Sequence, residues 1–410
     1  MGKKITISYS ELVLFVFFLL YFQPVIIERI SGQLDFVSRM LNVVMFVSIA
    51  FVRTIRNKRL VIGSRFNSMF IVFNIWNIIC ILFMAPGIIF DYFKELIYIV
   101  EFWTILNLYS DEIDCVWNSL SIVSATYIII NSLSLLMWPN GLFYSHMGSS
   151  IERAQWILGS KNNIALYTII FLMFIHIKEY KTHKSTIMLI DIIAFMTVAC
   201  SGSNGFQIVG GSSTGIAACA ICIMLLSLNV KNRLGNFRMT SSLTNCLVLL
   251  SVFNAVFLFG SMTFGNYISG LFNKKLIYGG RIPIWQTSLK YISKSPLFGY
   301  GYNRFGYRFF NGSRTLLTTY TYNTVLGILI RYGLISAILL ALVIISVKKS
   351  NTYITRIVIC IFFSLGIWGI MNELDFRYIF IPLICIESSK EEYNDNTSDN
   401  ELKQHLFLGA

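Results

Sequence analysis

The chain has 410 residues, of which 55% are hydrophobic and only 13% are charged, and its mean hydropathy is +0.66. Soluble globular proteins carry about 25% charged residues, so this composition excludes a pair of ordinary soluble domains. A membrane span needs about 20 mostly apolar residues, and lipid forces it to be helical because its backbone groups must pair internally. We therefore expect an all-α, polytopic membrane protein.

About twelve apolar stretches follow one another along the chain, and each is a candidate transmembrane helix. They cover residues 11–28, 35–52, 67–86, 91–109, 116–137, 163–177, 186–200, 213–229, 243–262, 319–347, 354–371 and 374–387. Lys and Arg gather after the second, sixth, eighth and tenth stretches, which the positive-inside rule places on the cytoplasmic side. Both termini are then predicted to be cytoplasmic.

The two ends of the chain differ from the apolar body. Lys3 and Lys4 precede the first span without a small-residue cleavage site, which indicates an uncleaved signal anchor. Residues 387–410 are polar and acidic and are predicted to form a disordered cytoplasmic tail. Residues 1–386 are then the membrane domain, with a large outer loop at 263–318 and a second outer loop at 138–162.

The large outer loop 263–318 carries eight Lys or Arg and no Asp or Glu. This inverts the positive-inside rule, which long loops escape because they cross the membrane largely regardless of charge. Within it, Pro283 suits the first turn of a helix, and Ser295-Pro296 would end it. The helical spacing of Trp285, Leu289 and Ile292 puts them on one face, so the loop is predicted to contain a short amphipathic helix at the membrane interface.

Arg281 is placed just before the start of this helix, beside Gly279-Gly280. Free backbone N–H groups and the helix dipole favour an anion there, and the guanidinium fork binds phosphate in bidentate fashion. The alternative is that the glycine pair is only a turn and that Arg281 extends to lipid headgroups.

The following segment, Gly299 to Gly306, combines glycines with rings and cations. It lacks the spacing of a dinucleotide-binding loop, so nucleotide binding by that route is rejected. Tyr302 can cover a sugar face and Arg304 can hold phosphate, with Arg308 further along. An aromatic belt at the membrane interface gives the same composition and stays an alternative.

Between Asp191 and Glu373 there is no acidic residue, whereas the same interval holds 15 Lys or Arg. Carboxylate-bound metal catalysis needs acidic ligands, so phosphate chemistry in this region would use Arg and Lys. We expect no metal and no cofactor. The alternative is that the basic loop lies on anionic lipid headgroups.

Two further outer segments carry polar residues. The second outer loop ends with Glu152 and Arg153, followed by Lys161 and Asn162 before the sixth span. The segment 201–215 is rich in Gly and Ser, which either permits close helix packing or places hydroxyl groups in a substrate cavity.

Several short motifs occur together in a fixed order. They are Gly159-Ser160-Lys161-Asn162, Ser212-Ser213-Thr214-Gly215, Arg281 with Trp285, Pro296-Leu297-x-Gly299-x-Gly301, Tyr322-Asn323 and Tyr332-Gly333-Leu334. In order and spacing, over roughly residues 150 to 345, the chain resembles the bacterial O-antigen polymerase and O-antigen ligase superfamily.

This resemblance implies an enzyme of the bacterial cytoplasmic (inner) membrane that acts on undecaprenyl-pyrophosphate-linked sugars at the outer face. A polymerase of this kind moves the growing O-antigen or capsule glycan onto the non-reducing end of the next lipid-linked repeat, without a metal. Its partners would be the lipid-linked oligosaccharide, membrane lipid and a chain-length regulator protein, with no nucleic acid. Cations would stabilise the charge on the departing pyrophosphate.

One position departs from the ligase pattern. Ligases of the superfamily commonly have a His before the Asn of the Tyr322-Asn323 pair, and a phenol is a poor base at neutral pH. The ligase reading is therefore disfavoured, and an outer carboxylate is needed to activate the acceptor. The candidate bases are Glu152, Glu373 and Asp375, with Glu101 in the fourth span less favoured.

The sequence thus favours a polymerase, with the ligase and a flippase of lipid-linked sugars as alternatives. A flippase would carry charges on several spans around a central cavity, whereas here the cations gather in one loop. The predicted catalytic residues are Arg281, Arg153, Tyr322, Asn323 and Glu152. The predicted substrate-binding residues are Lys161, Asn162, Trp285, Tyr302, Arg304, Arg308, Arg314 and Arg331.

Overall fold

The computed structural model describes residues 8–57, 64–85, 89–147, 151–179, 186–202, 204–208, 210–230, 243–271, 281–301, 307–311, 314–318, 320–347 and 353–388. These residues form a helical, multi-pass membrane protein, which confirms the predicted fold class. Among them, five helical segments have the length and composition to cross a membrane. They are Gly32–Ile55, Arg65–Met84, Ser110–Met137, Leu243–Ser261 and Thr324–Ser346.

Each predicted span has a helix as its counterpart. The helices are α1 (Tyr9–Tyr21), α2 (Val25–Ile30), α3 (Gly32–Asn57), α4 (Arg65–Met84), α5 (Ile89–Leu108), α6 (Ile113–Met137), α7 (Lys161–Glu179), α8 (Thr186–Cys200), α9 (Ser213–Val230), α10 (Leu243–Leu271), α11 (Arg281–Lys294), α12 (Thr324–Ser346), α13 (Tyr353–Gly369) and α14 (Phe376–Ser388).

Helix α7 lies at the centre of the bundle. It packs against α6, α8, α9 and α13, and every residue from Ile164 to Ile177 is buried. A helix that is apolar on all sides belongs in such a central position. By contrast, the apolar side chains of α3 are largely exposed, as expected of a helix that faces lipid. The bundle therefore has a packed interior and a lipid-facing rim.

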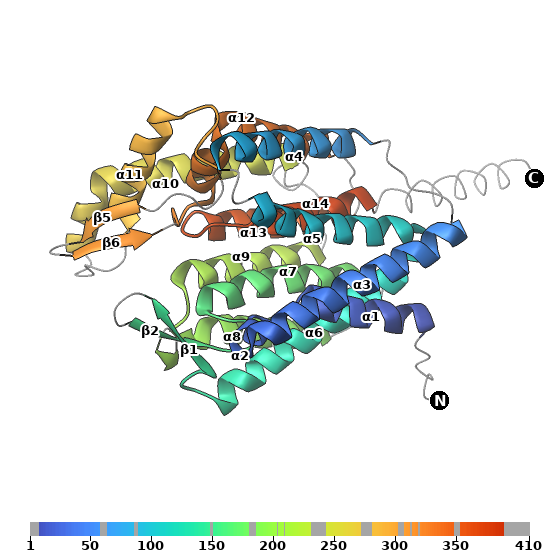
Figure 1. The fold of residues 1–410 in the computed structure, drawn as a ribbon. Coiled ribbons are helices and arrows are strands. Elements are labelled where there is room, and N and C mark those ends of the chain that lie inside the picture. Colours follow the sequence, from blue (N-terminus) through green and yellow to red (C-terminus); the bar gives the residue numbers. More distant parts are fainter. Residues whose placement is uncertain are drawn as a thin grey trace, which may run out of the picture.

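The elements that connect the spans gather at one end of the bundle, which we call the loop end. Figure 1 shows α11 and the larger hairpins there, whereas α1 begins and α14 ends at the opposite end. The hairpin β1–β2 and helix α11 lie on opposite sides of the loop end (Figure 1). The loop end corresponds to the side that the sequence predicts to be extracytoplasmic.

The structure corrects several predicted boundaries. The first predicted span, 11–28, is broken into α1 and α2, because Pro24 disfavours the helical conformation of the residue before it. Helix α10 runs on to Leu271, into the predicted loop. Arg281 is the first residue of α11 instead of preceding it, and Leu289 is 39% exposed, so the buried face of α11 is formed by Ile284, Trp285 and Ser288.

Both outer segments contain antiparallel hairpins that the sequence analysis did not predict. Strands β1 (Phe143–Met147) and β2 (Ile151–Gln155) pair in the second outer loop, and β5 (Tyr307–Asn311) and β6 (Arg314–Thr318) pair in the large loop. A two-residue pair, β3 (Ser201–Gly202) with β4 (Gly205–Phe206), precedes α9. The large loop is thus a helix plus a hairpin instead of short helices alone.

Three other expectations lie outside the described residues. They are the signal anchor of the first residues, Gly279-Gly280, and the tail beyond Ser388.

Candidate functional site

Trp285 connects helix α11 to the segment that precedes α12. The Trp285 ring is completely buried, and its Nε1 donates a hydrogen bond of 3.0 Å to the carbonyl of Thr321. It makes an edge-to-face contact with Phe257 from α10, with 6.1 Å between the ring centroids. Trp285 is therefore not accessible to a substrate in this conformation, and it positions α11 instead.

The contact of Trp285 with Thr321 places Arg281 beside Tyr322. The Arg281 Cζ lies 5.3 Å from the centroid of the Tyr322 ring, within the range of a cation–π contact. Tyr322 has a φ of 54°, the left-handed region that a residue with a side chain rarely adopts. Such backbone strain costs about 1–3 kcal/mol and persists where the surroundings impose it. Two residues that sequence reasoning assigned to one site are thus neighbours.

Asn323 holds the strained turn in place. It is the N-cap of α12, with its Oδ1 accepting from Leu326 N, and its Nδ2 donates to Asn254 Oδ1 at 2.7 Å and to the Ile370 carbonyl at 3.0 Å. Its side chain is completely buried. In this conformation Asn323 ties α12 to α10 and α13, and its amide does not face a substrate.

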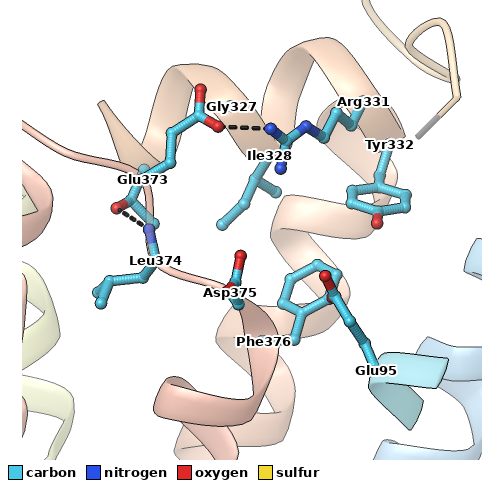
Figure 2. A pocket seen from close by; sticks show the side chains of 10 residues that line it. Glu95, Gly327, Ile328, Arg331, Tyr332, Glu373, Leu374, Asp375 and Phe376 are labelled. Carbon is cyan, nitrogen blue, oxygen red and sulfur yellow. Dashed lines mark hydrogen bonds and ion pairs between the residues drawn. The ribbon is translucent and has the colours of Figure 1, made fainter. Parts of the chain in front are cut away.

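Glu373 connects this turn to α12. Thr321 donates from its backbone N and from its Oγ1 to Glu373 Oε1, and Arg331 Nη2 donates to Glu373 Oε2. Figure 2 shows the ion pair, whose side chains are only 15% (Arg331) and 6% (Glu373) exposed. Because its oxygens accept from three donors, Glu373 is better suited to positioning Arg331 than to taking a proton from a substrate.

A polar pocket lies beside this ion pair. It has an empty volume of about 300 Å³ and is lined by residues of α5, α12 and the turn before α14, among them Glu95, Arg331, Tyr332 and Asp375. In Figure 2 the Asp375 carboxylate and the Arg331 guanidinium point toward the same space. Asp375 is 45% exposed. Of the candidate bases, Asp375 is therefore the one that faces this pocket with an accessible carboxylate.

Tyr320 lies next to Tyr322, with 6.4 Å between the ring centroids. Partial burial raises the pKa of the Tyr320 phenol, the nearby Asp375 raises it further, and Arg331 opposes the shift. The phenol therefore stays protonated at neutral pH and can donate a hydrogen bond.

A break in α12 presents Arg331 to the pocket. Gly333 has a φ of 74° inside the helix, and the loop after α11 occupies the gap. Tyr300 N and Gly301 N donate to the carbonyls of Ile330 and Arg331, each at 2.8 Å, while Leu334 N donates to the Pro296 carbonyl at 2.8 Å. The loop supplies the hydrogen bonds that the broken helix lacks, as backbone inside a membrane protein requires.

The glycines of the Pro296–Gly301 segment have a steric role in this contact. Gly299 has a φ of 67°, and a Cβ there would lie 2.6 Å from the Ile330 carbonyl oxygen. Phe298 stacks on Trp76 of α4, with ring centroids 5.7 Å apart. Of the segment Gly299 to Gly306, which the sequence analysis considered for substrate binding, the described residues 299–301 belong to the loop that closes the helix break.

An apolar pocket adjoins the polar one. It lies between α10, α12, α13 and α14, has an empty volume of about 710 Å³, and is lined mostly by Leu, Ile, Val, Phe and Gly side chains. Thr324, Ile328 and Leu374 line both pockets. The polar pocket and the apolar pocket are therefore neighbours that share these three side chains.

The remaining predicted residues lie elsewhere or are described only in part. Lys161 and Asn162 begin α7, and Glu152 and Arg153 lie in β2, where the structure describes the backbone alone. The same holds for Arg308 in β5 and Arg314 in β6. Tyr302 and Arg304 are outside the described residues. Strand β2, which contains Arg153, and helix α11, which begins at Arg281, lie on opposite sides of the loop end (Figure 1).

Comparison with known families adds to this geometry. Residues 205–341 match the family model described as O-antigen ligase. This match covers about a third of the chain and is consistent with the resemblance of its motifs to the O-antigen ligase and polymerase superfamily. The matched region runs from β4 through α9, α10 and α11 into α12, so it includes Arg281, Tyr322 and Arg331 but ends before Glu373. Family members are glycosyltransferase-like membrane enzymes. Searches of curated proteins and of solved structures returned no match.

Proposed function

We propose that the chain is a glycan repeat-unit polymerase of the bacterial cytoplasmic membrane. It would transfer a growing O-antigen or capsule glycan from undecaprenyl pyrophosphate to the non-reducing end of the next lipid-linked repeat. The observation that carries this proposal is the pair of adjoining pockets. A polar pocket that adjoins an apolar one suits an amphipathic ligand, with a charged sugar head and a hydrocarbon tail.

The residues divide the proposed reaction between them. Arg281 and Arg331 hold the pyrophosphate and stabilise the charge it gains as it leaves. An acceptor hydroxyl oxygen forms a bond to the anomeric carbon, and the bond from that carbon to the phosphate oxygen breaks, with its electrons leaving on the pyrophosphate. The acceptor proton passes to Asp375. Glu373 keeps Arg331 in position.

The presence of tyrosine at position 322 supports polymerase over ligase activity. Ligases of the superfamily commonly have a histidine at the position of Tyr322, whereas here the ring carries Arg281 on its face. In this proposal Tyr322 orients the arginine, and the base is supplied from the turn before α14. The base and the cation thus reach the substrate from different elements.

The direct test is elongation of purified lipid-linked repeats by the purified protein. A polymerase yields a ladder of products, and a strain lacking the gene yields surface glycan of a single repeat. Surface glycan that is absent altogether in that strain would indicate a ligase or a flippase and would contradict the proposal.

Arg281→Lys tests the anion contact within the same assay. A point charge cannot replace a planar fork, so we expect elongation to fall by at least about tenfold. Arg29→Lys, at an exposed position of α2, is the matched control. Normal ladders from Arg281→Lys would remove Arg281 from the site.

A further inference from the structure

A second arginine, Arg377, lies on the other side of the turn that carries Asp375. It is the second residue of α14, and its nearest described carboxylate is Asp375, with 3.9 Å between Nη2 and Oδ2. That distance is at the limit of an ion pair. The Arg377 Nε is buried and has no hydrogen-bond partner among the residues that the structure describes. The guanidinium therefore has donor capacity that the protein leaves unused.

The surroundings of Arg377 are aromatic. Its Cζ lies 4.5 Å from the centroid of the Tyr378 ring and 5.9 Å from that of Tyr98. Tyr21 and Tyr167 complete a narrow pocket between α1, α5, α7 and α14, with an empty volume of about 240 Å³. Tyr21 OH donates to the Tyr98 carbonyl at 2.9 Å, which fixes that wall.

This environment leaves the cation only partly compensated. Rings attract a guanidinium, but they accept no strong hydrogen bond from it. The Arg377 side chain is 30% exposed, but its Nε is buried, and a buried donor of a charged group is costly unless it is hydrogen-bonded. An oxyanion beside Nε would supply both the charge and the acceptor, as phosphate and carboxylate groups do in bidentate contacts with arginine.

The pocket is distinct from the site proposed above. Arg331 faces the polar pocket from α12, whereas Arg377 faces the tyrosines from α14. Asp375 lines the polar pocket and is also the nearest described carboxylate to Arg377. A group bound at Arg377 would therefore lie close to the carboxylate that we propose as the base.

We infer that the Arg377 pocket binds an oxyanion carried by the glycan substrate. The inference rests on the proposed function only for the molecule that carries the anion. The anion is either a phosphate of the lipid linkage or a carboxylate of an acidic sugar, since both present the same acceptor geometry to a guanidinium.

The test is ligand-induced stabilisation of the full-length protein in detergent. The melting temperature is measured against increasing inorganic phosphate and, separately, methyl glucuronide, at constant ionic strength, because a ligand of the native state raises it by mass action. All proteins carry Arg281→Gln, which removes the contribution of the first anion contact. Further variants on this background are Arg377→Gln, Arg377→Lys, and Arg29→Gln as the control.

We expect saturable stabilisation by at least one of the two anions. Arg377→Gln should raise the anion concentration that gives half-maximal stabilisation by about tenfold or more, because a hydrogen bond between charged groups is lost. Arg29→Gln should leave this concentration unchanged. Arg377→Lys keeps the charge and so gives an intermediate midpoint if the Gln variant does not fold. Stabilisation by phosphate alone assigns the lipid linkage, and stabilisation by glucuronide alone assigns an acidic sugar.

Equal midpoints in all variants, or no saturable stabilisation by either anion, would overturn the inference. The proposed polymerase activity would fail separately, as an absence of elongation. Arg377-dependent binding in a protein that does not elongate glycans would leave this pocket standing and remove the polymerase assignment.

Discussion

Arg331 and Arg377 occupy comparable places at the loop end but have different partners. Arg331 is bound by Glu373, which is itself held by Thr321, so its charge is compensated within the protein. Arg377 has rings and a carboxylate 3.9 Å away. The comparison teaches that an arginine in a membrane protein can be held in position for a ligand by its own ion pair, as Arg331 is, or can depend on the ligand for its counter-charge, as we propose for Arg377.

Stability should separate the two arginines most clearly. Arg331→Met would leave the Glu373 carboxylate buried without its cation and is expected to lower the unfolding free energy by about 3–5 kcal/mol. Arg377→Met removes a poorly compensated charge and should change it by less than about 1 kcal/mol. Unfolding in denaturing detergent measures both. Similar losses in the two variants would break the comparison.

Asp375 lines the polar pocket, and its carboxylate lies 3.9 Å from the Arg377 guanidinium. Asp375→Asn removes the proposed base without changing the side-chain size, so elongation should fall by about 100-fold or more while the protein stays folded. Single-turnover rates with lipid-linked repeats give the measurement. Asp111→Asn, an exposed position between α5 and α6, is the control. An Asp375→Asn protein that retains a tenth of the activity would exclude Asp375 as the base.

The helix break supports only the Arg331 pocket. A Cβ at Gly333 would clash with the Leu297 carbonyl and would sit at a φ of 74°, so Gly333→Ala should cost about 1–3 kcal/mol of stability and reduce elongation. Gly260→Ala in α10, where a Cβ meets nothing within 4 Å, should be neutral or stabilising. Anion binding at Arg377 should survive in both variants.

The smallest effect is expected in the apolar pocket. Ser251→Trp places a large ring in that pocket and should raise the KM for lipid-linked repeats several-fold, or about 1 kcal/mol. Val252→Trp, on the neighbouring lipid-exposed position, should leave the KM unchanged. If both substitutions act alike, the pocket is not where the hydrocarbon tail lies.

The sequence predicted the parts of the fold that depend on hydropathy. Apolar runs located the helices, and the spacing around Trp285 located α11, because burial follows periodicity. The spacing misplaced one face residue, Leu289, since neighbouring elements decide which side is covered. The hairpins at both outer loops were missed because their strands carry charged residues such as Glu152 and Arg308, without the apolar alternation that indicates a strand.

The candidate site was only partly predictable. Arg281 and Tyr322 were selected by motif, and Arg331 by its charge within an apolar stretch, and the structure shows why that charge is tolerated. Its pairing with Glu373 joins residues 42 positions apart, which no local pattern reveals. Glu95 and Arg377 were overlooked because each sits near the end of a span, where a charge is ordinary. Their presence in pockets is a consequence of packing.

The break at Gly333 also has a consequence for chimaeric proteins. Since the backbone of residues 296–301 completes the helix around residues 330–335, neither segment is finished without the other. An exchange of the outer loop between relatives that ends at residue 318 would combine residues 296–301 of one protein with the helix break of the other. Exchanges that run from α11 through Ile335 would transfer residues 296–301 together with the helix break that they complete. These are the chimaeras expected to fold.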